Sequence, residues 1–271
     1  MMYLAESKKM LSAEYQKRSV LIADDYQREF MLEKIRHSYQ VLGAGNFLLK
    51  HERCFADLSE DRKDYLQAIV LLHDIGRFFE ILEIRQGRRV DHGAYGAQYL
   101  TAFKDFNDMD ALLPIKHHGH LIECLFEDDD FKMLSEQKQK EVLKISFLVR
   151  DADKLANFYL LSHEYGTMEK VFFVENCFDN PYSQEIGDEV WKDFTMCQCI
   201  NRKNIHNFAE HALFFLAWIF DLHYQYSFVF LKKLNILEKL ITQFSKFWTM
   251  EQTQNIKDVV LKYQKLKNKN L

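Results

Sequence analysis

Residues 71–77 read Leu71-Leu72-His73-Asp74-Ile75-Gly76-Arg77, an apolar run that ends in an adjacent histidine and aspartate followed by a glycine. Apolar residues precede His73 at helical spacing: Leu66, Ile69 and Val70. This spacing predicts that His73 lies on the buried face of a helix, which Gly76 helps to end. Asp74 follows about 100° further round the same turn, so one ion can reach both side chains.

The His73-Asp74 pair predicts a metal site if the carboxylate is buried. Burying a carboxylate without a partner costs several kcal/mol, so it needs a cation or a shell of hydrogen-bond donors. An imidazole beside a carboxylate suits a divalent ion of the Mn, Fe, Co, Ni or Zn kind. The pair alone has low specificity, because a hydrogen bond at a helix end explains many such dipeptides.

The composition favours an all-α protein. The chain has 271 residues, 48% of them hydrophobic, with only 2 prolines and 9 glycines to interrupt helices. This length suits one large domain or two small ones. The net charge of -4, with no basic face in a known nucleic-acid motif, argues against nucleic acid as a partner.

The cysteines and the hydrophobic runs predict a cytoplasmic protein. The cysteines are odd in number and lack the spacing of a disulfide framework: Cys54, Cys124, Cys177, Cys197 and Cys199. We therefore expect reduced thiols. The N-terminus shows no apolar signal core, and the longest apolar run, residues 212–220, is far shorter than the ~20 residues that span a bilayer. No membrane partner is expected.

Further histidines fall on the apolar faces of predicted helices. In a helix expected over residues 28–50, His37 shares a face with Val41, Ala44 and Leu48. Glu33, one turn earlier, could reach the same site. His51 is the competing histidine, but its polar surroundings indicate a surface or capping residue. Asp91 is expected to cap a helix whose inner face begins with His92.

Periodicity alone does not choose between two neighbouring histidines, but it does separate two aspartates. In the segment 112–122, His117 and His118 each share an apolar stripe. In a long helix expected over residues 135–164, Asp153 lies on the core stripe, whereas Asp151 is interpreted as a surface charge. The pair Arg88-Arg89, in a predicted loop, either meets an anionic substrate or is solvated.

The two ends of the chain are predicted to be helical and structural. Residues 1–27 form an extension, with Tyr15 and the cluster Val20-Leu21-Ile22 packed on the main body. After Gly166 an irregular aromatic connection includes Phe172 and Phe173. Helices then return. Within the aromatic stretch 208–230, the run Phe214-Phe215-Leu216-Ala217-Trp218 is expected to be core or a face between copies of the chain in a homo-oligomer.

Taken in chain order, the inward polar residues resemble the pattern of the HD superfamily of metal-dependent phosphohydrolases: His37, His73-Asp74, His92, His117 or His118, and Asp153. The resemblance covers residues 28–164. Arg36-His37-Ser38 looks like the first metal-histidine helix of the family, and His51 would leave too little chain before His73. Ala152-Asp153-Lys154-Leu155 is similar to its closing Ala-Asp signature, which assigns the last ligand to Asp153.

The resemblance implies an all-α HD-domain helical bundle, residues 28–164, with residues 165–271 as additional C-terminal helices packed on it. It implies a first metal held by His37, His73, Asp74 and Asp153. A second metal, bridged by Asp74, would be held by His92 and a later histidine. The family word Ile-x-x-His favours His118 for that role, with His117 as the fallback. The metals would be two ions of Mn, Fe, Ni, Co or Zn.

The activity implied by the resemblance is hydrolysis of a phosphomonoester or phosphodiester, expected in a nucleotide, by metal-activated water. Asp74, Arg77 and Lys154 would be catalytic, with Arg77 and Lys154 contacting the phosphate. Arg77 stands where many relatives have lysine. No Gly-Tyr-Pro follows the histidine pair, so the substrate of the HD-GYP subgroup is not carried over.

Two other classes of protein compete with this hypothesis. A non-catalytic HD-fold module that binds metal or nucleotide would be marked by the loss of a ligand, and none is lost. A plain helical interaction protein would have to bury two aspartates and at least three histidines without a metal. The cost of burying such groups argues against it.

Overall fold

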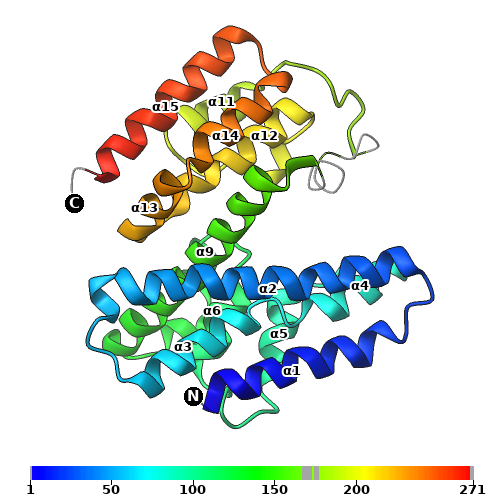
Figure 1. The fold of residues 1–271 in the computed structure, drawn as a ribbon, viewed down its shortest axis with the longest axis vertical. Helices are drawn as coiled ribbons and strands as arrows, with labels where there is room; N and C mark the ends of the chain where they lie inside the picture. Colours follow the sequence, from blue (N-terminus) through cyan, green and yellow to red (C-terminus); the bar gives the residue numbers. More distant parts are fainter. Residues whose placement is uncertain (1, 167–172, 174–176, 269–271) are drawn as a thin grey trace. The chain divides into compact units, whose positions relative to one another are not determined.

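The computed structural model describes residues 2–166, 173 and 177–268, and these residues contain helices but no strand (Figure 1). The predicted all-α class is therefore confirmed. The chain divides into two compact units, Met1–Asp153 and Lys154–Leu271. The boundary falls inside the long helix α9 (Glu136–His163) rather than at a linker. The predicted domain bounds at residues 28 and 164 stay a prediction.

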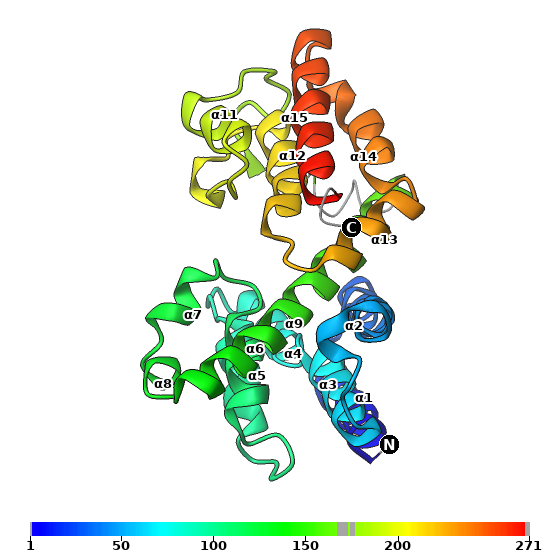
Figure 2. The same ribbon diagram turned by 90° about the vertical axis from the view of Figure 1, so that its left-hand side faces the viewer.

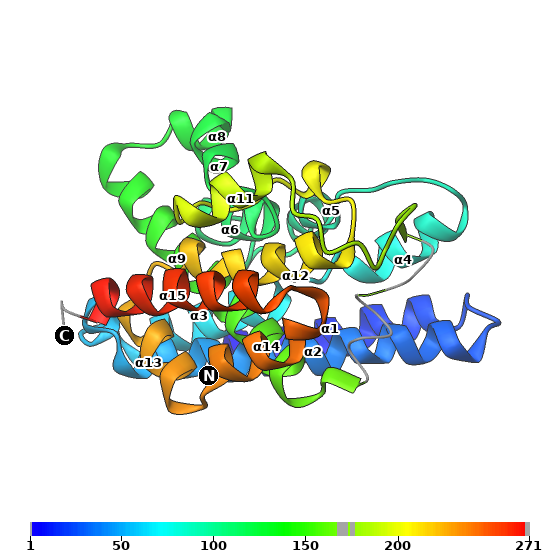
Figure 3. The same cartoon turned by 90° about the horizontal axis from the view of Figure 1, so that it is seen from above.

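The first unit contains the HD pair. Its elements are α1 (Met2–Ser19), α2 (Asp25–His51), η1 (Arg53–Phe55), α3 (Glu60–Leu72), α4 (Arg77–Arg85), α5 (His92–Leu100), α6 (Met109–His117), α7 (Glu123–Glu127), α8 (Asp129–Lys132) and the first part of α9. Helices α1 and α2 form an antiparallel pair (Figure 3). Both pack on α3, and α5 packs on α6.

Helix α3 is the centre of the first unit, and its sequence explains why. Ser59 caps its N-terminus by accepting a hydrogen bond from the amide of Arg62 at 3.2 Å, and Glu60 and Asp61 favour the positive end of the helix dipole. From Leu66 to Leu72 almost every side chain is fully buried. Full burial of one such aliphatic side chain contributes roughly 1.5–3 kcal/mol, so this helix anchors the residues that follow it.

Gly76 has a different role from the predicted one. It does not adopt the left-handed conformation of a helix-ending glycine, because its φ is -74°, and it directly precedes α4. Its importance lies in close packing: a Cβ atom at this position would lie 2.1 Å from the carbonyl oxygen of His92 and 2.7 Å from the amide nitrogen of Gly96. Gly76 therefore lets α5 approach the His73-Asp74 turn.

The N-terminal extension is helical, but one detail of its predicted packing is wrong. Ile22 is buried, whereas Val20 and Leu21 are 77% and 62% exposed. They lie in the turn between α1 and α2, which carries them away from the core. Tyr15 does pack on the main body, with its ring in edge contact with Phe78 at 6.2 Å.

The second unit is built from α11 (Asp188–Thr195), η3 (Arg202–Asn204), α12 (Phe208–Ala217), η4 (Trp218–Asp221), α13 (Gln225–Lys233), α14 (Ile236–Phe244), η5 (Ser245–Phe247) and α15 (Met250–Asn268) (Figure 2). Phe215, Leu216 and Ala217 are buried, so this part of the aromatic run is core. Phe173 is buried as well, whereas Phe172 lies outside the described residues. Among the described residues, no helix combines the length and apolarity needed to span a membrane.

Candidate metal centre

Helix ends place two histidines of the candidate site. His73 follows α3 directly and His118 follows α6 directly, where the last main-chain carbonyls of a helix have no partner within it. Nδ1 of His73 lies 2.9 Å from the carbonyl oxygen of Val70, and Nδ1 of His118 lies 2.7 Å from that of Ile115. Each Nδ1–H donates to its carbonyl. Nε2 of His73 therefore presents a lone pair to the site, whereas Nε2 of His118 lies 3.2 Å from Oδ1 of Asp74 and donates to it in the metal-free protein.

The first group of candidate ligands consists of His37 from α2, His73 after α3 and Asp153 from α9. Their ligand atoms all lie within 4.8 Å of one another. Nε2 of His37 is 2.9 Å from Oδ1 of Asp153, and Nε2 of His73 is 3.7 Å from the same oxygen. The structure thus brings together three residues that the sequence predicted on separate helices. Their role as ligands stays a prediction.

The surroundings of His73 fit a bound cation. The side chain is fully buried, and Nε2 has no hydrogen-bond partner among the described residues. Its neighbours are carboxylate oxygens of Asp153 at 3.7 Å and Asp74 at 3.8 Å, both too distant for a hydrogen bond. A lone pair that faces two carboxylates is unfavourable unless a cation lies between them. Imidazole nitrogens with carboxylate oxygens suit Mn, Fe, Co, Ni or Zn.

A second group surrounds Asp74 and shares His73 with the first. The ligand atoms of His73, Asp74 and His118 lie within 4.8 Å of one another. Oδ1 of Asp74 is 3.2 Å from Nε2 of His118 and 3.3 Å from Nε2 of His92, and these two nitrogens are 3.1 Å apart. Oδ2 of Asp74 is the oxygen near His73. The two oxygens of Asp74 therefore face different histidines, as a bridging carboxylate requires.

Arg77 contacts two residues of this second site, His92 and Asp74. Its Nη2 donates a hydrogen bond of 2.8 Å to Nε2 of His92, and its Nε lies 3.5 Å from Oδ1 of Asp74. Glu80, one turn further along α4, pairs with Nη1 of Arg77 at 2.5 Å and lies 3.6 Å from Nδ1 of His92. Glu80 was not among the residues predicted from the sequence. Its spacing of three residues from Arg77 was the available signal, since such residues are neighbours on a helix.

The electrostatics of the site favour ionised carboxylates and a neutral His73. Burial alone would raise the pKa of Asp74, but Arg77, His73 and hydrogen bonding to His118 hold it well below the usual range. Burial opposes ionisation of Asp153 too, yet His37 and His73 lower its pKa. Burial lowers the pKa of His73 to about 4. Ionised carboxylates beside a neutral imidazole are the forms that coordinate metals. Burial alone would lower the pKa of His118, but the hydrogen bond to Asp74 and the charges of Asp74 and Asp153 together raise it, so His118 must lose a proton to bind a metal.

Lys34 belongs to the electrostatic environment of the site, and the sequence analysis missed it. Burial lowers the pKa of its ammonium, as does the charge of Arg77, while Asp74 and Asp153 act in the opposite direction. Glu33, which was expected to reach the site, instead pairs with Arg36, and its side chain is 41% exposed. Glu33 lies four residues before His37 and Lys34 lies three residues before it. Both spacings place a residue on the same helix face as His37, so the sequence could not decide between them.

The structure separates the two neighbouring histidines. His118 lies at the site, whereas Nε2 of His117 is 2.7 Å from Oδ2 of Asp128. Neither His117 nor His92 belongs to a group whose ligand atoms all lie within 4.8 Å of one another, but Nε2 of His92 lies 3.3 Å from Asp74. Both histidines of the pair are buried at the end of α6, so their helical spacing alone left the choice open. The assignment of His118 as a ligand stays a prediction.

Other predicted residues have mixed outcomes. Asp151 is fully buried, so its interpretation as a surface charge is wrong; α9 is covered on more than one side at this point. Nζ of Lys154 pairs with Asp221 at 2.8 Å, and its predicted contact with phosphate stays a prediction.

Asp91 caps α5 as expected, accepting bonds from the amides of Gly93 and Ala94. His51 is exposed at the end of α2.

The comparisons with known proteins agree with this geometry. Residues 35–157 match the family model of the HD domain, so this part of the chain is an HD domain. The match contains every candidate ligand from His37 to Asp153. Such domains are typical of metal-dependent phosphohydrolases. A search of curated proteins and a search of solved structures found no significant match.

Proposed function

We propose that this HD domain hydrolyses a phosphomonoester or phosphodiester, in a nucleotide, with two divalent metal ions. The observation that carries the proposal is the buried Nε2 atom of His73, which has no hydrogen-bond partner among the described residues and faces carboxylates of Asp74 and Asp153. A hydrogen-bonded core histidine would not have this environment. The HD-domain match supports the same reading.

The chain's residues divide the work between two ligand groups. His37, His73 and Asp153 would hold the first ion, and His92 and His118 the second, with Asp74 in contact with both. When bound, two such ions bind phosphate oxygens and lower the pKa of a water molecule between them. Main-chain carbonyls fix the rings of His73 and His118, so these donors need little reorganisation before they bind.

In this proposal, Arg77 would stabilise negative charge on the phosphate. Its guanidinium lies beside Asp74 and His92, and its planar donors match two phosphate oxygens. Glu80 holds one end of the guanidinium and so fixes its orientation. The phosphate contact proposed for Lys154 requires its ion pair with Asp221 to open.

Metal analysis and a substrate screen test this function. The purified protein is loaded with Mn²⁺ or Fe²⁺, its metal content is measured, and nucleotides, cyclic nucleotides and an aryl phosphate are screened by phosphate release and product chromatography. His73→Ala should lose metal and activity, whereas His51→Ala, at an exposed histidine of α2, should lose neither. Bound metal without turnover of any ester would instead indicate a non-catalytic metal- or nucleotide-binding module. Absence of bound metal would exclude both.

A further inference from the structure

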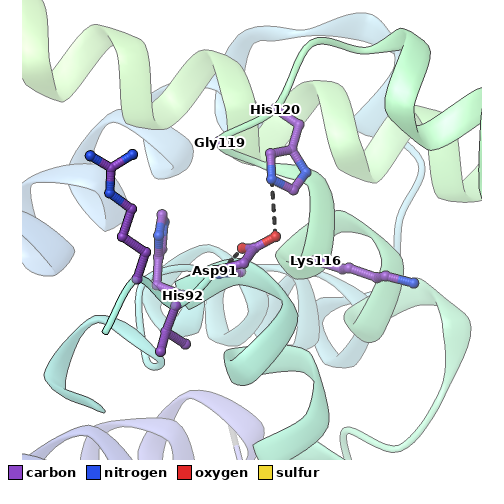
Figure 4. A pocket seen from close by; sticks show the side chains of 8 residues that line it. Asp91, His92, Lys116, Gly119 and His120 are labelled. Carbon is purple, nitrogen blue, oxygen red and sulfur yellow. Dashed lines mark hydrogen bonds and ion pairs between the residues drawn. The ribbon is translucent and has the colours of Figure 1, made fainter. Parts of the chain in front are cut away.

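A cavity of about 320 Å³ adjoins the candidate metal centre. Its walls come from the loop before α5, the first residues of α5 and the end of α6 with the turn that follows (Figure 4). His92 belongs to both places: it lines the cavity, and its Nε2 atom lies 3.3 Å from Asp74 and 3.1 Å from His118. A molecule held at the metal centre can therefore extend past His92 into this cavity.

The cavity keeps its volume because glycine stands next to His92. A Cβ atom on Gly119 would meet only the imidazole ring of His92, at 3.6 Å. Gly93, which also lines the cavity, packs so closely on α6 that a Cβ atom there would lie 2.5 Å from the carbonyl oxygen of Lys116. The volume falls within the range of pockets that hold small molecules, at its lower end.

The charges around the cavity favour an anionic group. Asp91 is the acidic residue in the lining, and its carboxylate already caps α5 and lies 3.1 Å from Nε2 of His120 (Figure 4). Lys116 pairs with Asp128 at 2.7 Å, but its side chain remains 37% exposed. Arg89 forms no ion pair with a described residue. The cavity thus has a guanidinium available to bind an anion.

The neighbouring arginine has a different environment. Arg88 pairs with Glu83 through its Nε atom and also bonds to Gln86, and it does not line the cavity. The sequence alone could not say which of the two arginines meets a ligand. Because they are adjacent, exposed and of the same chemistry, they form a matched pair for an experiment.

We propose that this cavity binds a second phosphate group of the substrate through Arg89. The substrate class is then an ester that carries two separate phosphates, as a nucleoside bisphosphate does. Among the residues that the structure describes, no Phe, Tyr or Trp lines the cavity, so a stacked base is a poorer match than a phosphate. This inference rests on the proposed function, since it places the scissile phosphate at the metal centre.

Binding by the Mn²⁺-loaded protein tests the inference. Calorimetry measures the affinity for adenosine 3′,5′-bisphosphate, adenosine 3′-monophosphate and adenosine 5′-monophosphate. The parent should bind the bisphosphate at least about tenfold more tightly than either monophosphate, the size expected for one charge-assisted contact. Arg89→Ala should remove most of this preference, and Arg88→Ala should retain it. Both positions are exposed, so both variants should fold, which circular dichroism checks.

The outcomes separate this inference from the proposed function. If the parent hydrolyses an aryl phosphate but binds the bisphosphate no more tightly than a monophosphate, the cavity inference is wrong and the function stands. Equal effects of Arg89→Ala and Arg88→Ala would overturn it as well. If the parent hydrolyses no ester yet shows a bisphosphate preference that depends on Arg89, the function fails and the cavity remains a phosphate site.

Discussion

Nε2 of His73 lies 3.7 Å from Oδ1 of Asp153, too far for a hydrogen bond and with no other partner for the nitrogen among the described residues. The ring cannot turn away, because Nδ1 is bonded to the carbonyl of Val70. A buried polar atom left unsatisfied costs about 1–3 kcal/mol. A metal ion between the two residues would offset that cost, so the metal-free protein should be less stable than the loaded one.

The first prediction follows from this relationship. Adding Mn²⁺ should raise the melting temperature of the parent, with a stabilisation of about 2.7 kcal/mol when free metal is 100 times its dissociation constant. Differential scanning calorimetry measures the shift. His73→Ala should lose most of it, and the exposed His51→Ala should keep it. An equal shift in His73→Ala would place the metal elsewhere.

The second prediction concerns the neighbouring histidines. His118→Ala should reduce the metal content measured by mass spectrometry, because its Nε2 lies 3.2 Å from Asp74. His117→Ala should leave the metal content largely intact, since its Nε2 is bonded to Asp128 outside both ligand groups. The reverse pattern would move the ligand assignment by one residue. Loss in both variants would mean that the pair acts together.

The third prediction concerns Arg77. Arg77→Ala should retain the metals, because guanidinium is not a metal ligand, and its removal leaves Nε2 of His92 available. The value of kcat/KM should fall. The expected loss corresponds to on the order of 2–3 kcal/mol of transition-state stabilisation, the size of a charge-assisted contact to phosphate. Steady-state kinetics with the aryl phosphate measures it, and Arg88→Ala is the control. Unchanged kcat/KM in Arg77→Ala would remove the residue from the mechanism.

Much of the site could be predicted from sequence because polar residues on apolar stripes are rare and costly. His37, His73 and Asp153 were found in this way, and the HD-domain match covers all three. Periodicity could not separate His117 from His118, because both side chains are buried. It also cannot show which of two residues on the same helix face turns inward, so Lys34 was missed and Glu33 was preferred.

Exposure was harder to predict than helix formation, since it depends on which other elements cover a helix. Asp151 is buried although it lies off the core stripe that carries Asp153. The division into two units could not be predicted from the sequence either. Its boundary lies within continuous helix α9, where the sequence has no proline, glycine or polar linker to mark it.

A fourth prediction concerns pH and the second unit. Burial, with a contribution from Arg202, lowers the pKa of His211 to about 4, and the ring stacks on Phe215 at 4.7 Å. The unfolded chain, with an ordinary histidine pKa near 6.5, therefore takes up the proton first as the pH falls. The contribution of His211 to stability is fully present above about pH 6.5 and decreases between 6.5 and 4, by about 1.4 kcal/mol per pH unit.

Urea unfolding at pH 7 and pH 5 measures this effect. Other buried histidines titrate too, so the comparison is between the parent and His211→Phe, which keeps an aromatic ring in the same position. The variant should lose less stability than the parent between the two pH values. Equal losses would show that His211 is not buried in its neutral form.

The last prediction places Asp74 at the centre of the site. Its Oδ1 lies near His118 and His92, and its Oδ2 lies near His73, so removal of its charge should weaken both ligand groups. Asp74→Asn keeps the size of the side chain but takes away the negative charge that balances two dications. Metal content should fall, and hydrolysis should decrease by several orders of magnitude, because generation of the nucleophile depends on the metals.

Asp128→Asn is the matched control for this change. The side chain of Asp128 is also a buried carboxylate bonded to a histidine, but its partners are His117 and Lys116, which lie outside the two groups of candidate ligands. This variant should keep its metals and its activity. Circular dichroism should show unchanged helicity in both variants, because the apolar faces of the helices are intact. If Asp74→Asn hydrolyses phosphate esters as fast as the parent, the mechanism with two metals bridged by Asp74 is wrong.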